Sequence, residues 1–266
     1  MDNKNSFSEI EDLIKSIKSP EAWLQISYHD IKQKYKRSTL GPFWTTVSQA
    51  IIVLFLSFLY SNLLNVPLKE YLPYLAVSFI LWNLLSSIIS ESCDVFSSSS
   101  NMLLQLRLPF YFYIFRLVSR NFIIFFHNMI IMVIVLIIFP KIFDFNFFPY
   151  LMIGLFFYFI SAVSVSMIIG IICTRFRDIT QIILSLLQLS FFITPILWKK
   201  EMVGDDLQWA ITFNPIVHYI DIIRYPYLGL DQNYYSLITV ITISLLLFVI
   251  SFLIFKKFKK KINYWL

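Results

Sequence analysis

Glycine is scarce in this sequence, and its spacing excludes a nucleotide-binding loop. The chain has 266 residues but only five glycines. No two of them are close enough to form GxxxxGK[ST] or GxGxxG, whose glycines let the backbone approach a phosphate group. The chain therefore cannot bind ATP through a P-loop of its own. The five are Gly41, Gly154, Gly170, Gly204 and Gly229.

Cysteine and histidine are also rare, which argues against a metal or catalytic site. The two cysteines and three histidines form neither CxxC nor HExxH, and no GxSxG elbow is present. We predict no metal ligand set and no catalytic residue. His218 and Asp221 are three positions apart, which suits a structural partnership better than a ligand pair. Cys93 and Cys173 both fall on the predicted cytoplasmic side, where thiols stay reduced, so we expect no disulfide.

Charged residues make up only 14% of the chain, whereas 58% is hydrophobic and 18% aromatic. This balance is typical of a polytopic membrane protein. Apolar runs of about 20 residues match the core of a bilayer, and we predict an all-α membrane protein with six transmembrane helices. Arg116 and Arg120 would be costly at the bilayer centre, so we place 110–120 at the interface. The predicted spans are 43–64, 71–90, 121–139, 148–173, 179–198 and 236–255.

The distribution of lysine and arginine predicts the orientation. Of these residues, 17 fall on the side of the two termini and 5 on the other side. The positive-inside rule then places both termini in the cytoplasm. The net charge is +6, and the basic residues border hydrophobic spans. This placement suits binding to anionic lipids better than binding to nucleic acid. We divide the chain into a cytoplasmic N-terminal segment, 1–42, a six-span domain, 43–255, and a basic cytoplasmic tail, 256–266.

The stretch KQKYKRSTLGPFW, residues 32–44, joins a basic segment directly to the first span. Ser19 and Pro20 stand in helix-starting positions upstream of it, and an apolar stripe with flanking cations follows them at helical spacing. We predict an amphipathic helix that lies flat at the membrane surface, in preference to a plain topology signal. The stripe consists of Leu24, Tyr28, Ile31 and Tyr35.

Two internal segments are predicted to face the cytoplasm. Residues 91–109 are rich in serine, as in a plain linker, but they contain a short apolar run. A short helix that docks on another protein explains this run better. In CTRFRDIT, residues 173–180, a charged turn is typical of a positive-inside anchor in which Asp178 caps the next helix. The apolar run consists of Met102, Leu103, Leu104 and Leu106.

The loop at 199–235 is too long for a simple turn and is predicted to lie on the outer side. Within it, Pro215 begins a helical pattern that is too short to cross a bilayer. We predict outer re-entrant helices here, which must pack on protein or line an aqueous path. Asp221 and Arg224 are three apart, so they can pair with each other. The apolar positions of this pattern are Ile216, Tyr219, Ile220 and Ile223.

The stretch RFRDITQIILSLLQLSFFITPILW, residues 175–198, resembles the fourth-to-fifth span region of ABC-2 type permeases that export polysaccharides. It shares a charged RD turn followed by a helix that ends in Phe-Phe-x-Thr-Pro. LGPFW at 40–44, the segment 101–109 and Asn214-Pro215 before Arg224 occur in the same order and spacing as in that family, which includes exporters of O-antigen, capsule and teichoic acid. The resemblance covers nearly the whole chain.

One departure from the family pattern lies after Asn101. Relatives often have a basic pair in this segment, whereas here Leu104 and Gln105 occupy those positions and Arg107 is the only cation. The docking surface is therefore expected to suit a differently charged partner.

The resemblance implies an assembly in which this chain is not an enzyme and has no cofactor. Two six-span copies would form a homodimer above two copies of a separate ATPase subunit, which binds ATP and Mg²⁺. The cargo would be a lipid-linked glycan, moved out of the cytoplasm across the inner (plasma) membrane. The alternatives are a membrane-bound glycan enzyme and a secondary transporter. The latter is weakened because the central portions of the six predicted spans contain no Asp or Glu.

The resemblance also suggests roles for individual residues. Lys34, Lys36 and Arg37 would attract the phosphate of the lipid-linked cargo, or would only anchor the helix at headgroups, and both interpretations stay open. Coupling to the ATPase would involve Asn101, Leu103, Leu104, Arg107 and Pro109. The conduit or gate would involve Phe43, Trp44, Arg175, Arg177, Asp178, Phe191, Phe192, Trp198, Asp221 and Arg224.

Overall fold

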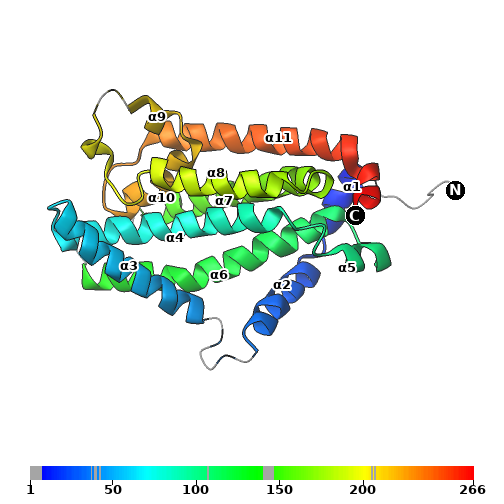
Figure 1. Ribbon diagram of the computed structural model, residues 1–266, viewed down its shortest axis with the longest axis horizontal. Helices are drawn as coiled ribbons and strands as arrows, with labels where there is room; N and C mark the ends of the chain where they lie inside the picture. Colours follow the sequence, from blue (N-terminus) through cyan, green and yellow to red (C-terminus); the bar gives the residue numbers. More distant parts are fainter. Residues whose placement is uncertain are drawn as a thin grey trace.

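The computed structural model describes residues 8–36, 38, 41, 43–106, 108–139, 147–204, 206 and 208–266. All of the regular structure in those ranges is helical, and the long helices run side by side along the longest axis of the molecule (Figure 1). The elements are α1 (Glu9–Ile17), α2 (Pro20–Lys34), α3 (Phe43–Leu63), α4 (Leu68–Ser92), α5 (Ser100–Gln105), α6 (Phe110–Ile138), α7 (Phe147–Arg175), α8 (Ile179–Ile193), the 3-10 helix η2 (Lys200–Met202), α9 (Gln208–Thr212), α10 (Pro215–Tyr227) and α11 (Tyr234–Trp265).

Five helices, α3, α4, α6, α7 and α11, are long and apolar enough to cross a membrane. They coincide with five of the six predicted spans. The other predicted span, 179–198, is helical only over the 15 residues of α8. Such a helix is about 22 Å long, which is short of a bilayer core of about 30 Å. It ends because Thr194 is extended and Pro195 cannot continue a helix. The count of six spans therefore stays a prediction.

Helix α6 begins at Phe110, eleven residues before the predicted start of its span at Asn121. The boundary was set by the cost of placing Arg116 and Arg120 in lipid. In the structure both arginines are paired within the protein. Arg116 Nε and Nη2 each lie 2.7 Å from an Asp30 carboxylate oxygen on α2, and Arg120 Nη2 lies 2.8 Å from Glu91 on α4. These partners offset the cost of burying the charges, so one helix runs through both positions.

Helices α4 and α7 form the centre of the bundle, whereas α3 and α11 are mostly exposed along their apolar lengths. Helix α7 packs against α11, α4, α10 and α6. The positions of α3 at one side and α11 at the opposite side of the bundle are visible in Figure 1. The extensive apolar surface left on the outer helices is what a membrane-embedded protein presents to lipid or to partner subunits.

Helix α2 begins with Ser19 as N-cap and Pro20 at the first position, as predicted, although the Ser19 side chain makes no capping hydrogen bond. The residues of the predicted apolar stripe differ in burial. Ile31 is buried, but Leu24 and Tyr28 are exposed. The face toward α6 instead contains Trp23, whose ring stacks on Phe115 at 5.5 Å, and Ser27, which donates to the Arg116 carbonyl oxygen at 2.8 Å. Leu24 and Tyr28 remain free to contact a membrane surface.

Helix α1 connects the N-terminal segment to the basic end of α11. Ser8 and Glu11 form a reciprocal capping box at its start. One turn later, Asp12 accepts a hydrogen bond from the Tyr111 backbone N–H at 3.1 Å and lies 3.1 Å from Lys259. Burial raises the pKa of the Asp12 carboxyl, while Lys259 opposes that shift. The contact fixes the start of the described chain against its last helix.

Candidate functional site

A buried ion cluster forms where α10 packs against α4 and the segment after α8. Asn214 caps α10 by accepting a hydrogen bond from the Ile216 backbone N–H at 3.0 Å, and Pro215 occupies its first turn, as predicted. The predicted pair of Asp221 and Arg224 is confirmed, with Arg224 Nη2 at 2.5 Å from Asp221 Oδ1. Their exposures are 0% and 2%, so the pair is fully buried rather than partly exposed.

Arg224 joins three segments of the chain. Its Nη1 donates to the Tyr74 hydroxyl at 2.9 Å, the Ser78 hydroxyl at 3.1 Å and the Pro195 carbonyl oxygen at 2.6 Å. Its guanidinium also lies over the Tyr74 ring, 4.6 Å from the centroid. The second oxygen of Asp221 is paired with Lys200. The cluster contains two cations and one carboxylate, and the other hydrogen bonds of Arg224 go to neutral groups.

Two tyrosines on α4 hold the segment that follows α8. The Tyr71 hydroxyl donates to the Leu197 carbonyl oxygen at 2.6 Å. The Tyr74 hydroxyl lies 2.8 Å from the carbonyl oxygens of both Pro195 and Trp198. These backbone groups lie beyond the end of α8, so the tyrosines satisfy acceptors that the helix no longer can. A cavity of about 180 Å³ that includes Tyr74, Lys200 and Arg224 in its lining lies beside the cluster.

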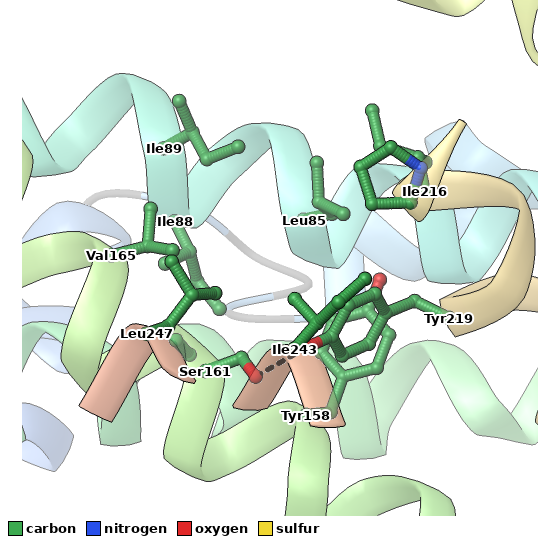
Figure 2. A pocket seen from close by; sticks show the side chains of 12 residues that line it. Leu85, Ile88, Ile89, Tyr158, Ser161, Val165, Ile216, Tyr219, Ile243 and Leu247 are labelled. Carbon is green, nitrogen blue, oxygen red and sulfur yellow. Dashed lines mark hydrogen bonds between the residues drawn. The ribbon is translucent and has the colours of Figure 1, made fainter. Parts of the chain in front are cut away.

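An apolar cavity of about 250 Å³ lies among α4, α7, α10 and α11. Figure 2 shows its aliphatic side chains, with Ser161 hydrogen-bonded to Tyr219 at one edge. The hydroxyls of Ser161, Tyr219 and Ser244 form a closed triangle of hydrogen bonds, 2.5, 2.7 and 2.9 Å long. Because these hydroxyls already bond to one another, the cavity suits hydrocarbon rather than sugar. No sequence pattern predicted a site at this position.

The aromatic candidates for a conduit fall into two groups. Phe191 packs on Phe192 at 5.4 Å, and Trp198 Nε1 donates to the Phe192 carbonyl oxygen at 3.1 Å, so the structure brings these three together. Phe43 and Trp44 instead begin α3, where both are exposed, and the described contacts do not join them to the first group.

An apolar surface extends from these aromatic residues. The outer face of α8 is exposed, and α8 has no fully buried residue. It includes Ile182, Leu186, Leu189, Phe192 and Ile193.

The segment 93–106 forms the end of the molecule near α1 and the C-terminus, opposite α9 and α10 (Figure 1). It contains the short helix α5, as predicted. Leu103 has 9% exposure and belongs to the protein's own core, whereas Leu106 is 49% exposed. The apolar run thus faces in two directions. Asn101 is exposed and Pro109 is the N-cap of α6, while Arg107 and the Leu104 side chain lie outside the described residues.

The charged turn between α7 and α8 lies beside this segment. Arg177 and Asp94 line the same cavity of about 420 Å³. Arg175 lies over the Phe176 and Trp265 rings, 5.0 Å from each centroid. Asp178 occupies the N-cap position of α8 but makes no capping bond.

The conduit and gate candidates are therefore divided between the two ends of α7. The turn that contains Arg175, Arg177 and Asp178 follows the C-terminal end of α7. Asp221 and Arg224 lie on α10, which packs near the N-terminal part of α7 through Ile223 and Gly154. The described contacts do not link the two groups directly.

A comparison with protein families decides the class of this chain. The profile of the ABC-2 type transporter family matches residues 21–228, from α2 through α10. The chain belongs to the ABC-2 type transporter family. With five long apolar helices, this ABC-2 chain is a multi-pass membrane protein and the membrane subunit of a transporter. The resemblance drawn from the RD turn and the Phe-Phe-x-Thr-Pro signature is confirmed.

Two curated relatives of this ABC-2 chain are each named O-antigen export system permease protein RfbA, from Klebsiella pneumoniae. They are 23% and 22% identical to it over 237 residues, and each alignment covers 88% of this chain and 90% of the relative. The similarity thus extends beyond the family profile over nearly the full length of both proteins.

Several members of the ion cluster in this ABC-2 chain were not predicted from the sequence. Tyr71, Tyr74 and Ser78 on α4 and Lys200 on η2 all bond to it or to the segment it holds. A signal was present, because positions 71, 74 and 78 share one face of a helix. The predicted partnership of His218 with Asp221 is wrong. Among the described residues, His218 bonds to the Ser236 hydroxyl and the Thr212 carbonyl oxygen instead.

Proposed function

We propose that this ABC-2 permease is the transmembrane subunit of an ATP-driven exporter for a lipid-linked polysaccharide. The observation that supports it most is the similarity, over 88% of the chain, to two permeases named for O-antigen export. Because the chain lacks a P-loop, a separate ATPase subunit with ATP and Mg²⁺ must supply the energy. An O-antigen, capsule or teichoic acid glycan on a lipid would be the cargo, and the inner membrane the location.

The main alternative, a secondary transporter, needs an ionisable group that can exchange an ion during transport. Asp221 is a carboxylate buried inside the bundle, but one oxygen is paired with Arg224 and the other with Lys200. A carboxylate held by two cations is poorly suited to release and rebind a coupling ion. The other alternative, a glycan enzyme, requires turnover by this chain alone.

The exposed faces of α3 and α8 support a second copy of the chain as partner. Helix α8 is too short to span a bilayer alone and packs only loosely on α4 and α7. A homodimer that pairs these faces around a central path would cover them. In this arrangement α10 acts as the re-entrant helix at the outer end, and the Arg224 cluster holds it against α4.

The proposal is tested by reconstitution. The permease, copurified with its candidate ATPase subunit in vesicles, should transfer a lipid-linked glycan across the membrane only when ATP is hydrolysed. The matched control is an ATPase subunit that binds but does not hydrolyse ATP. Uptake driven by an ion gradient without ATP would point to the secondary transporter, and modification of the glycan by this chain alone would point to the enzyme.

The exposure of Leu106 predicts that it contributes to the ATPase interface. Leu106→Asp should reduce copurification of the ATPase subunit about tenfold, since a charge replaces an apolar contact, and should leave the thermal stability of the permease unchanged. The matched control is Leu103→Asp. It places a charge in the permease's own core and should lower the stability itself. Undiminished copurification with Leu106→Asp would show that the ATPase binds elsewhere.

Orientation is tested by labelling single cysteines. In a background with Cys93→Ala and Cys173→Ala, the exposed positions Asp206 and Lys260 are each changed to cysteine. We expect an impermeant maleimide to label Asp206→Cys in intact cells and to label Lys260→Cys only after the membrane is opened. Labelling of Lys260→Cys in intact cells would reverse the proposed topology. Only variants that still export should be labelled, so that labelling of a misfolded chain is not taken as evidence of topology.

A further inference from the structure

A charged cleft of about 530 Å³ lies between α2, the end of α4 and α6. It is separate from the outer ion cluster and from the apolar cavity, since it shares no lining residue with either. Its lining includes three cations and two carboxylates, so the charged groups leave one positive charge in excess. These groups are Lys34, Arg116, Arg120, Asp30 and Glu91.

The three cations differ in the contacts that they already make with carboxylates. Arg116 makes a bidentate pair with Asp30, both contacts at 2.7 Å. Arg120 is shared, with Nη2 at 2.8 Å from Glu91 and Nη1 at 3.6 Å from Asp30. Lys34 is exposed and, among the described residues, pairs with no carboxylate. Lys34 and Arg120 are therefore the cations with capacity left for an anion.

Tyr113 provides an independent indication of a ligand at this cleft. It lines the cleft from α6 and is 1% exposed. Its hydroxyl is buried and has no hydrogen-bond partner among the described residues. A buried hydroxyl left unpaired is costly and rare, so an acceptor supplied by a ligand would remove that cost. Ser98 and Ser99 also line the cleft.

We infer that this cleft binds a phosphate group, with Lys34 and Arg120 as its cations and the Tyr113 hydroxyl as a neutral donor. A phosphate offers several acceptor oxygens and negative charge, which matches the one positive charge in excess. The cleft is lined in part by α2, the predicted interface helix, whose Leu24 and Tyr28 are exposed. A lipid headgroup is the source that this position favours, and a soluble phosphate is the other source of the same chemistry.

The inference deepens the proposed function, because it gives the permease a site for an anionic lipid next to its interface helix. It also extends the suggested phosphate contacts of Lys34 to residues on α6. Lys36 lies outside the cleft lining, and Arg37 lies outside the described residues. The site is tested by binding alone, without the ATPase subunit or transport, so its failure and a failure of the export proposal are separate results.

The experiment measures binding of short-chain phosphatidic acid to the purified full chain in detergent by native mass spectrometry. Short-chain phosphatidylcholine is the zwitterionic control, and inorganic phosphate is the soluble arm. Lys34→Gln and Tyr113→Phe should each weaken binding of the anionic lipid about tenfold. Tyr113→Phe should not lower the thermal stability of the unliganded protein, because its hydroxyl has no partner to lose. Lys32→Gln, an exposed cation on the same helix outside the cleft, is the matched control and should bind as the unchanged protein does.

Weaker binding in both cleft variants with unchanged binding in Lys32→Gln supports the site. The same dependence seen with inorganic phosphate and not with lipid supports the site and assigns it to a soluble phosphate. Equal losses in Lys32→Gln and Lys34→Gln would show general attraction to a basic surface and overturn the inference. Unchanged binding in Tyr113→Phe would also overturn it, because the hydroxyl would then have no part in the site.

Discussion

Replacing Arg224 with alanine is expected to lower the free energy of unfolding by about 3–5 kcal/mol, because it leaves one member of a buried ion pair behind. Asp221 would keep only Lys200, and the Pro195 carbonyl oxygen would lose its charged donor. The segment after α8 would then be held to α4 by its tyrosines alone. We expect a large drop in the thermal unfolding midpoint in detergent and loss of export.

The Arg224 prediction has two matched comparisons. Lys199→Ala removes a neighbouring cation that lines the cavity beside the cluster and has no ion pair among the described residues. It should change stability by less than about 0.5 kcal/mol. The double variant Asp221→Asn with Arg224→Met removes both charges and should be less destabilised than Arg224→Ala, because no buried carboxylate is then left with Lys200 as its only partner. If Arg224→Ala unfolds at the temperature of Lys199→Ala, the cluster does not hold this end of the bundle together.

If the double variant folds but does not export, the cluster is required for gating as well as for stability. The burial of Arg224 determines the expected effect of its loss. A partly exposed pair would affect export more than stability, whereas a buried pair is expected to affect both.

Replacing Gly170 with alanine is expected to displace the turn that precedes α5. A Cβ atom at Gly170 would lie 2.6 Å from Val95 Cγ1 and 3.0 Å from Phe96 Cε2. The contact with Val95 is too short, the contact with Phe96 is tight, and both side chains are buried, so we expect the turn to shift away from α7. Overpacking of this kind costs about 1–3 kcal/mol. Because the turn leads into the proposed ATPase-binding segment, we expect ATP hydrolysis without a matching rate of export.

A second substitution tests whether this contact is the cause. Val95→Ala removes the methyl group that the new Cβ would meet, so Gly170→Ala combined with Val95→Ala should recover much of the stability and coupling. Gly204→Ala is the matched control, since no atom lies within 4 Å of its Cβ position. If Val95→Ala adds its own loss to that of Gly170→Ala, the two residues do not compete for the same space.

Features that depend on residues close together in the chain were predicted well from the sequence. The positions of α3, α4, α7 and α11 followed from the length of apolar runs. The start of α10 followed from Pro215, and the pairing of Asp221 with Arg224 followed from their i, i+3 spacing. The local motifs around the RD turn were also enough to indicate the family. Each of these depends on residues close together in the chain, whose geometry one helix or one turn determines.

The tertiary structure decided which apolar and charged residues face the protein. The sequence pattern does not distinguish Leu103 from Leu106, yet Leu103 is in the core and Leu106 is exposed. In a membrane protein, lipid-facing and core-facing side chains are equally apolar, so hydropathy alone cannot separate them. Arg224 bonds to Tyr74, 150 positions away in the chain, and Arg116 to Asp30, 86 positions away. The sequence by itself determined the helical membrane class and the local ends of its helices, whereas only the packing of those helices brought the ion cluster and the cleft together, because their members meet across the bundle rather than along one helix.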